Sequence, residues 1–220
     1  MAEQAEQGHP DAQYSLGNAY YNGDGVAEDV EVAMEWYRKA AEQGHADAQQ
    51  MLGDLANDGE VAVEWYCKVA EQGRADAQLD LGTIYYHGRR GVTQDREVGV
   101  AWYRKAAEQG DSCAQYSLGY AYYHGEGIAQ DRAVGVAWLY KAAKKGNADA
   151  MRLLAAESEE KGDHNAAMRW YREAAEEGDS AAMLSLGCAY YNGKGVAQDR
   201  EVAAKWLREG AEQGDPRLLL

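Results

Sequence analysis

Two histidines in this chain call for a test of metal binding, because imidazole is a common ligand of transition metals. His87 and His124 occupy equivalent places in neighbouring copies of a repeated segment. Packed neighbouring helices lie roughly 10 Å apart, which is too far for one metal ion to bind both rings. No carboxylate recurs beside either histidine. We therefore predict solvated histidines at helix ends, with no metal site and no cofactor.

A serine and a lysine have the spacing of a known nucleophilic motif. Ser158 and Lys161 spell the Ser-x-x-Lys of penicillin-recognising enzymes, in which the serine is the nucleophile. The companion motifs Ser-Asp-Asn and Lys-Thr-Gly do not follow it, and it falls where a helix is expected to end. The Gly-x-Gly segments lack the preceding strand and the third glycine of a phosphate-binding loop. We predict no catalytic residues.

Three cysteines, Cys67, Cys113 and Cys188, stand at different places in their repeats. An odd count without a recurring spacing is neither a disulfide framework nor a metal motif. Free thiols in a reducing compartment and small core residues remain as interpretations. The chain has no apolar run long enough to span a membrane, and its start does not resemble a signal peptide. We expect a cytoplasmic protein, or a periplasmic or secreted one if a signal segment has been removed.

The charge balance is strongly acidic, with a net charge of −15 at pH 7. Nucleic-acid binding requires clustered lysine and arginine, so this class of partner is not expected. The acidity is explained most simply by a solvated surface whose charges repel one another. A preference for a basic segment of a partner protein is the second interpretation.

The elements that must position these residues are copies of one helical hairpin. Each tryptophan is followed 12 residues later by an alanine, or once by a leucine, in the pairs Trp36/Ala48, Trp65/Ala77, Trp102/Ala114, Trp138/Ala150, Trp170/Ala182 and Trp206/Leu218. Repeat units therefore open at Ala12, Ala48, Ala77, Ala114, Ala150 and Ala182, with partial repeats at 1–11 and 218–220. We predict one repeat domain over 1–220, in which each hairpin buries its apolar face against its neighbours. Because the chain starts and stops inside a repeat, we expect a segment of a longer array or self-association through uncapped ends.

The first complete unit shows why each copy should fold as two helices. Leu16 and Tyr20 belong to an apolar face with helical spacing, and Trp36 belongs to the face of the following helix. We predict that these three residues and their equivalents form the core. Asp29 is a suitable N-cap for the second helix. Pro10 and Pro216 each follow a glycine by two residues, where the first residue of a new helix is expected.

The units resemble the Sel-1-like repeat family, a relative of the tetratricopeptide repeat. The shared signature is Ala-x-x-x-Leu-Gly-x-x-Tyr, Gly-x-Gly-Val-x-x-Asp, Ala-x-x-Trp-Tyr and Ala-Ala-x-x-Gly, which units one, four and six carry almost completely. The resemblance implies an all-α fold, a right-handed α-solenoid of about six helix-turn-helix repeats, with the first helices lining a concave face. It also implies a scaffold or adaptor that holds other proteins. A cysteine-rich branch of the family has been linked to β-lactam hydrolysis, but its paired cysteines are missing here.

If the first helices line the groove, the positions two, six, nine and ten after each opening alanine point into it. We predict that partner contacts there are made by Tyr14, Asn18, Tyr86, His87, Tyr116, Tyr120, Tyr123, His124 and Arg152. Tyrosine suits peptide recognition because it combines a large contact area with a hydroxyl group. The alternative for Tyr86 and Tyr123 is that they only cover the ends of their hairpins. The sequence thus predicts a non-enzymatic scaffold that binds a peptide or helix of a partner protein, with a β-lactam or cell-wall amide hydrolase as the alternative.

Overall fold

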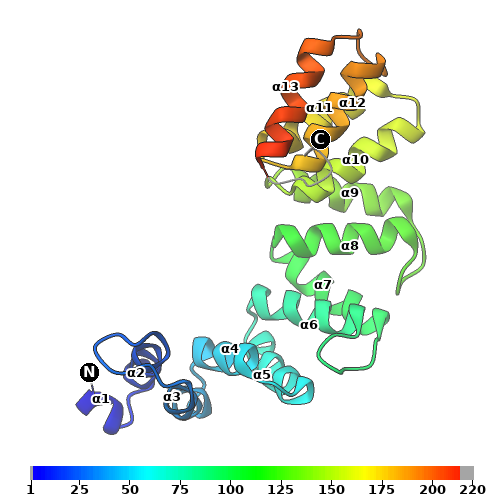
Figure 1. The fold of residues 1–220 in the computed structure, drawn as a ribbon. Coiled ribbons are helices and arrows are strands. Elements are labelled where there is room, and N and C mark those ends of the chain that lie inside the picture. The colour runs from blue at the N-terminus through cyan, green and yellow to red at the C-terminus, as the bar shows by residue number, and fades with distance from the viewer. Residues whose placement is uncertain (1, 214–220) are drawn as a thin grey trace. The chain divides into compact units, whose positions relative to one another are not determined.

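The computed structural model describes residues 2–213 of the chain, and all regular elements in this range are helices (Figure 1). Contacts divide the chain into two compact units, Met1–Gln109 and Gly110–Leu220. The first unit holds α1 (Ala2–Glu6), α2 (Pro10–Asn22), α3 (Val30–Glu42), α4 (Ala46–Leu55), α5 (Gly59–Glu71), α6 (Ala75–His87) and α7 (Arg96–Glu108). The second holds α8 (Ser112–His124), α9 (Arg132–Ala143), α10 (Ala148–Glu160), α11 (His164–Glu176), α12 (Ser180–Asn192) and α13 (Arg200–Glu212).

Sequential pairing organises the helices of each unit. In the first unit the packed hairpins are α2 with α3, α4 with α5 and α6 with α7. In the second unit they are α8 with α9, α10 with α11 and α12 with α13. The predicted all-α fold of helix-turn-helix repeats is therefore confirmed, and the pairing is consistent with an α/α solenoid.

The helix ends follow the capping residues of the sequence. Asp29 accepts a hydrogen bond from the backbone N–H of Val32 at 3.0 Å, as predicted for an N-cap. Gly23 ends α2 in the left-handed conformation, with φ of 74°. Pro10 is the first residue of α2, as expected. Pro216 and the partial repeat 218–220 lie outside the described residues.

The core contains small and branched side chains rather than the tryptophans. The leucines four positions after each opening alanine, from Leu52 onward, are at most 3% exposed, whereas Leu16 is half-buried. Trp36 and Tyr20 are also half-buried, so they lie at the edge of the core that the sequence predicted, and Tyr20 packs against its buried residues. The residue after Trp36, Tyr37, is fully buried instead. The ring of Trp36 carries the Lys39 ammonium 3.9 Å above its centre, an arrangement that recurs at three further tryptophans.

The second and fifth hairpins have short loops, and each is covered by a basic residue from the next repeat. Arg90, from the loop between α6 and α7, donates hydrogen bonds to the carbonyl oxygens of Gly53 at 2.8 Å and Ala56 at 3.3 Å. These contacts satisfy carbonyl groups at the C-terminal end of α4, where a positive charge is favoured. Lys194, from the loop between α12 and α13, pairs with Glu159 near the end of α10 at 3.2 Å. Loops of neighbouring repeats therefore compensate for the missing turns.

Candidate partner-binding site on helix α8

Two of the predicted groove residues of α2 contact other residues of the repeat array. Tyr14 stacks on His45, with ring centres 4.6 Å apart. Asn18 accepts a hydrogen bond from the hydroxyl of the buried Tyr37 at 2.8 Å. Burial raises the pKa of Tyr37 to about 12, and the neighbouring Tyr14 and Tyr21 add to the effect. Tyr14 and Asn18 are both half-buried, and Asn18 has a structural role whether or not it also contacts a partner.

The acceptor position of Asn18 recurs along the chain, but its chemistry changes at α8. Asp54 of α4 accepts from the Tyr66 hydroxyl at 2.6 Å in the same way. In α8 the equivalent residue is Tyr120, and the facing position on α9 holds Leu139, which has no hydroxyl group. No hydrogen bond is therefore required of Tyr120 within its own hairpin.

Tyr86 and Tyr123 are not exposed as the groove prediction requires. Their exposed fractions are 6% and 3%, so the alternative, in which they cover the hairpin ends, describes them. Arg132 lies over the Tyr123 ring, 4.7 Å from its centre, and His124 packs edge-on against it at 5.0 Å. His87 packs edge-on against Tyr86 at 5.0 Å in the same manner. These tyrosines are therefore beyond the reach of a ligand on the helix surface.

The hydroxyl group of Tyr123 belongs to a small network of charged side chains at the end of α10. Its hydroxyl donates to the carboxylate of Glu157, which is 7% exposed. Burial, followed by this hydrogen bond, raises the pKa of Tyr123 to about 12. The Lys161 ammonium lies 2.8 Å from the other Glu157 oxygen, and this pairing, with the Tyr123 hydroxyl, holds the pKa of Glu157 below its usual value. The network fixes the end of the fifth hairpin, where the Gly-x-Gly loop is missing.

The serine and the lysine of the Ser-x-x-Lys motif each contact a different partner. Ser158 donates its hydroxyl proton to the Leu154 carbonyl oxygen one turn earlier, at 2.8 Å. The Lys161 ammonium is paired with Glu157, and this contact raises the pKa of Lys161. A raised pKa keeps the lysine protonated near neutral pH, which is the wrong state for a general base.

Three of the predicted groove residues form one row of aromatic rings along helix α8. Tyr116, Tyr120 and His124 lie one turn apart, with ring centres separated by 6.1 Å between the tyrosines and 4.3 Å between Tyr120 and His124. Both tyrosines are half-buried, and His124 is exposed. Among the described residues, neither tyrosine hydroxyl has a hydrogen-bond partner. We call Tyr116, Tyr120 and His124 the α8 row.

Arg152 of α10 lies beside one end of the α8 row. Its guanidinium pairs with Asp149, and its Nε lies 3.2 Å from a carboxylate oxygen of Asp179, although the angle is too poor for a hydrogen bond. Burial raises the pKa of Tyr116; Asp149 adds to the shift and Arg152 opposes it, which places both charges near this ring. The structure thus brings four predicted residues together in the second unit: the α8 row and Arg152.

Sequence reasoning missed a series of buried glutamines at the junctions between repeats. Gln49, which follows the opening alanine of α4, is 4% exposed and donates to the Ala41 carbonyl oxygen at 2.9 Å. It also accepts from the Gln72 amide at 2.9 Å. Gln13 and Gln78 make the same two contacts in their own repeats. The recurring Ala-Gln pair and the Glu-Gln-Gly segment were the signals that could have revealed them.

No group of three or more histidine, cysteine, aspartate and glutamate side chains in the part of the chain that the structure describes is arranged to hold a metal ion. No described helix combines the length and the apolar character needed to cross a bilayer.

Comparisons with known proteins place these hairpins in a family. The model of the Sel1 repeat matches six consecutive segments, at residues 10–45, 46–73, 75–111, 114–147, 148–179 and 180–215. No curated protein matches the chain.

Two solved structures resemble the chain over nearly its whole length. One is a protective antigen with an SLR fold from uropathogenic Escherichia coli strains, with 36% identity and a TM-score of 0.87 over 99% of this chain. The other is a Sel1 repeat protein from Oxalobacter formigenes, with 35% identity and a TM-score of 0.85 over 97% of this chain. The chain covers 49% of the first protein and 65% of the second. An immunity protein from Pseudomonas aeruginosa shares the fold at 19% identity, with a TM-score of 0.58 over 96% of this chain and 83% of its own. The chain belongs to the Sel1 repeat family.

Proposed function

We propose that this Sel1 repeat protein is a non-enzymatic scaffold that binds a peptide or helix of a partner protein through the α8 row. The observation that carries the proposal is the set of half-buried tyrosines, Tyr116 and Tyr120, whose hydroxyls have no partner among the described residues. At the position of Tyr120, Asn18 and Asp54 of earlier repeats each accept a hydrogen bond from a tyrosine hydroxyl of their own hairpin. The α8 row therefore contributes less to its own hairpin than its equivalents do.

The geometry of the row suits a short helical or extended segment. Three aromatic side chains one turn apart cover roughly 12 Å along the helix axis. Tyrosine and histidine rings provide contact area with few rotatable bonds, and the free hydroxyls provide hydrogen bonds to a partner backbone. The net charge of −15 favours a partner whose flanks are basic. Arg152, held by two carboxylates, adds a fixed donor group at one end of the row.

Selection from a phage-displayed library of random peptides tests the proposal, with the immobilised 220-residue chain as bait. Synthetic copies of the enriched peptides are then titrated against the wild-type chain and the Tyr116→Ala/Tyr120→Ala variant. Removing two central aromatic contacts is expected to weaken binding by about 30-fold or more. The matched control is Tyr140→Ala, which removes a tyrosine that is 45% exposed on α9. Peptides that bind the double variant as tightly as the wild type would remove the α8 row from the proposal.

The absence of catalysis is part of the same proposal, and the engaged states of Ser158 and Lys161 support it. A chromogenic β-lactam assay is the direct test. Hydrolysis by the purified chain that disappears in Ser158→Ala would establish the rival function, whereas the scaffold proposal predicts no turnover above background.

We also propose a cytoplasmic location, supported by the exposed free thiols of Cys113 and Cys188, which an oxidising compartment would tend to pair. Fractionation of cells that express the full-length protein from its own gene tests this, and recovery in an extracytoplasmic fraction would contradict it.

A further inference from the structure

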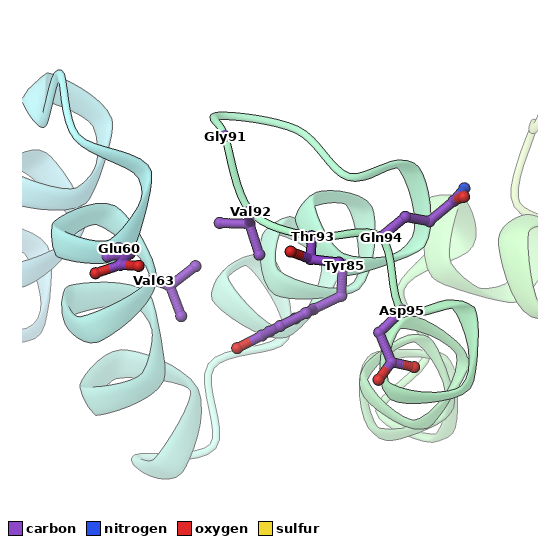
Figure 2. A pocket seen from close by; sticks show the side chains of 8 residues that line it. All are labelled: Glu60, Val63, Tyr85, Gly91, Val92, Thr93, Gln94 and Asp95. Atoms are coloured by element: carbon purple, nitrogen blue, oxygen red, sulfur yellow. The ribbon is translucent and has the colours of Figure 1, made fainter.

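A cavity of about 470 Å³ in the first unit lies between α5 and the loop that joins α6 to α7 (Figure 2). Glu60 and Val63 contribute from α5, and Val92 and Thr93 contribute from the loop. The ring of Tyr85 extends from α6 toward α5 in the middle of the view, and Asp95 lies beyond it at the start of α7. None of these residues belongs to the α8 row.

The cavity follows from the repeat irregularities rather than from the regular hairpin. The second hairpin has no Gly-x-Gly loop, so α5 begins at Gly59, directly after the N-cap Asp58. The backbone of Arg90 covers that start so closely that a Cβ atom on Gly59 would lie 1.7 Å from the Arg90 carbonyl oxygen. The Arg90 guanidinium donates hydrogen bonds to carbonyl oxygens at the end of α4, so its positive charge lies there and not in the cavity. The residues that line the cavity include the carboxylates of Glu60 and Asp95 but no lysine or arginine.

The cavity walls combine two features that match one kind of side chain. Val63 and Val92 provide apolar surface, and the Tyr85 ring provides an aromatic face. Glu60 is exposed, and its carboxylate has no hydrogen-bond or ion-pair partner among the described residues. Asp95 uses one carboxylate oxygen to cap α7 through Val98, at 3.0 Å, which leaves its second oxygen free. Burial raises the pKa of Tyr85, and the Cys67 thiol and Asp95 add to the effect.

We propose that this cavity binds an arginine side chain of a partner protein. The aliphatic part of the side chain packs between Val63 and Val92, and the planar guanidinium stacks on Tyr85. The guanidinium then donates to Glu60 on the α5 side of the cavity, whose carboxylate offsets its charge. The overall acidity of the chain attracts such a basic partner over longer distances. This second contact point does not depend on the α8 row.

The probe for this site is the peptide Ac-Gly-Arg-Gly-NH2, added to the full chain and followed through the methyl NMR signals of Val63 and Val92. We expect saturable shifts of these methyl signals. Glu60→Gln is expected to weaken the apparent affinity by about 5-fold, since one partly exposed charge pair is lost. The control Glu71→Gln, which removes the same charge from the far end of α5, should leave the affinity unchanged.

Two further peptides separate the arginine proposal from simpler explanations. Replacing arginine by citrulline keeps the shape but removes the charge, and this peptide should not shift the Val63 and Val92 signals. Replacing arginine by lysine keeps the charge but removes the planar group, and it should bind more weakly. Equal shifts with the citrulline peptide, equal affinity with the lysine peptide or an unaffected Glu60→Gln variant would each overturn the proposal. The Tyr116→Ala/Tyr120→Ala variant should bind the arginine peptide with the same affinity as the wild type, which distinguishes this site from the α8 row.

Discussion

The residue that follows each opening alanine decides how a repeat contacts the repeat before it. In the first four repeats this residue is a buried glutamine, and in the first three its amide group bonds a backbone carbonyl and a second glutamine. In the fifth and sixth units it is Met151 and Met183, which join the apolar core of the second unit. A buried amide is costly unless both of its ends are bonded, so the polar junction requires all of its members.

Replacement of Gln78 by leucine tests this junction. The change removes the side-chain hydrogen bond to the Ala70 carbonyl oxygen, which keeps the Gly73 N–H, and leaves the Gln109 amide without its Gln78 acceptor, so the free energy of unfolding should fall by about 1–3 kcal/mol. Urea denaturation followed by circular dichroism measures the loss. The control Gln198→Leu removes an amide that is exposed and bonded to the Tyr191 carbonyl oxygen. Gln78→Leu should lower the free energy of unfolding more than Gln198→Leu does. Equal losses would contradict a special role for the buried glutamine.

Alkaline pH should destabilise the protein through Tyr37. Its pKa is raised from 10.0 to about 12 in the folded state, because burial disfavours the phenolate. The stabilising contribution is therefore complete below about pH 10 and is lost as the pH rises toward about 12. We expect Tyr37→Phe to lose about 1–2 kcal/mol less than the wild type over this range. Urea denaturation at both pH values measures the difference, and Tyr140→Phe, at an exposed position, serves as the control. If Tyr37→Phe lost as much unfolding free energy as the wild type, the assignment to Tyr37 would be refuted.

At the scale of the helical hairpins, the loops and not the helices differ between repeats. Two loops are short, and in both cases the following repeat supplies a basic residue, Arg90 or Lys194, at the end of the first helix. Arg90 is held in the left-handed conformation with φ of 57°, which is unfavourable for a residue with a side chain. The hydrogen bonds of its side chain to three carbonyl oxygens at the C-terminal end of α4 compensate for that conformation.

Gly59→Ala tests the close packing between the second hairpin and the loop of the third. Helix propensity alone predicts a gain in stability, because alanine is the better helix former. The structure predicts a loss of about 1–3 kcal/mol, because a Cβ atom would lie 1.7 Å from the Arg90 carbonyl oxygen and the backbone must move. Thermal or urea unfolding gives the sign directly. A more stable variant would show that the loop does not lie against α5.

The hairpins were predictable from sequence because the signals that define them are local. Asp29 and Pro10 act within one helical turn, and the spacing from tryptophan to alanine fixes the junction of the repeats. The sequence left both an exposed and a covering role open for Tyr123, because the choice depends on Glu157, which contacts it from 34 residues away. The half-burial of Trp36 was missed because a tryptophan at an apolar position of a helix is normally predicted to lie in the core. Here Lys39 covers the outer face of the ring. The cavity beside α5 required a deletion in one repeat and an insertion in the next to be considered together.

At the scale of the whole chain, the two units carry different surfaces. The first unit holds the cavity with free carboxylates, and the second holds the α8 row beside Arg152. A partner with a basic segment and a segment that packs on tyrosines would satisfy both proposals. Each surface can be removed by substitutions that leave the other in place, so their contributions are separable.

The central claim is that Tyr116 and Tyr120 form a binding surface, and the most direct test is an NMR measurement of contacts between chains. The full chain with 13C-labelled tyrosine rings is mixed with an unlabelled peptide from the library selection, and intermolecular nuclear Overhauser effects are recorded. We predict contacts from the peptide to the rings of Tyr116 and Tyr120, with none to the buried ring of Tyr123. A bound peptide whose contacts all fall on other tyrosines would contradict it.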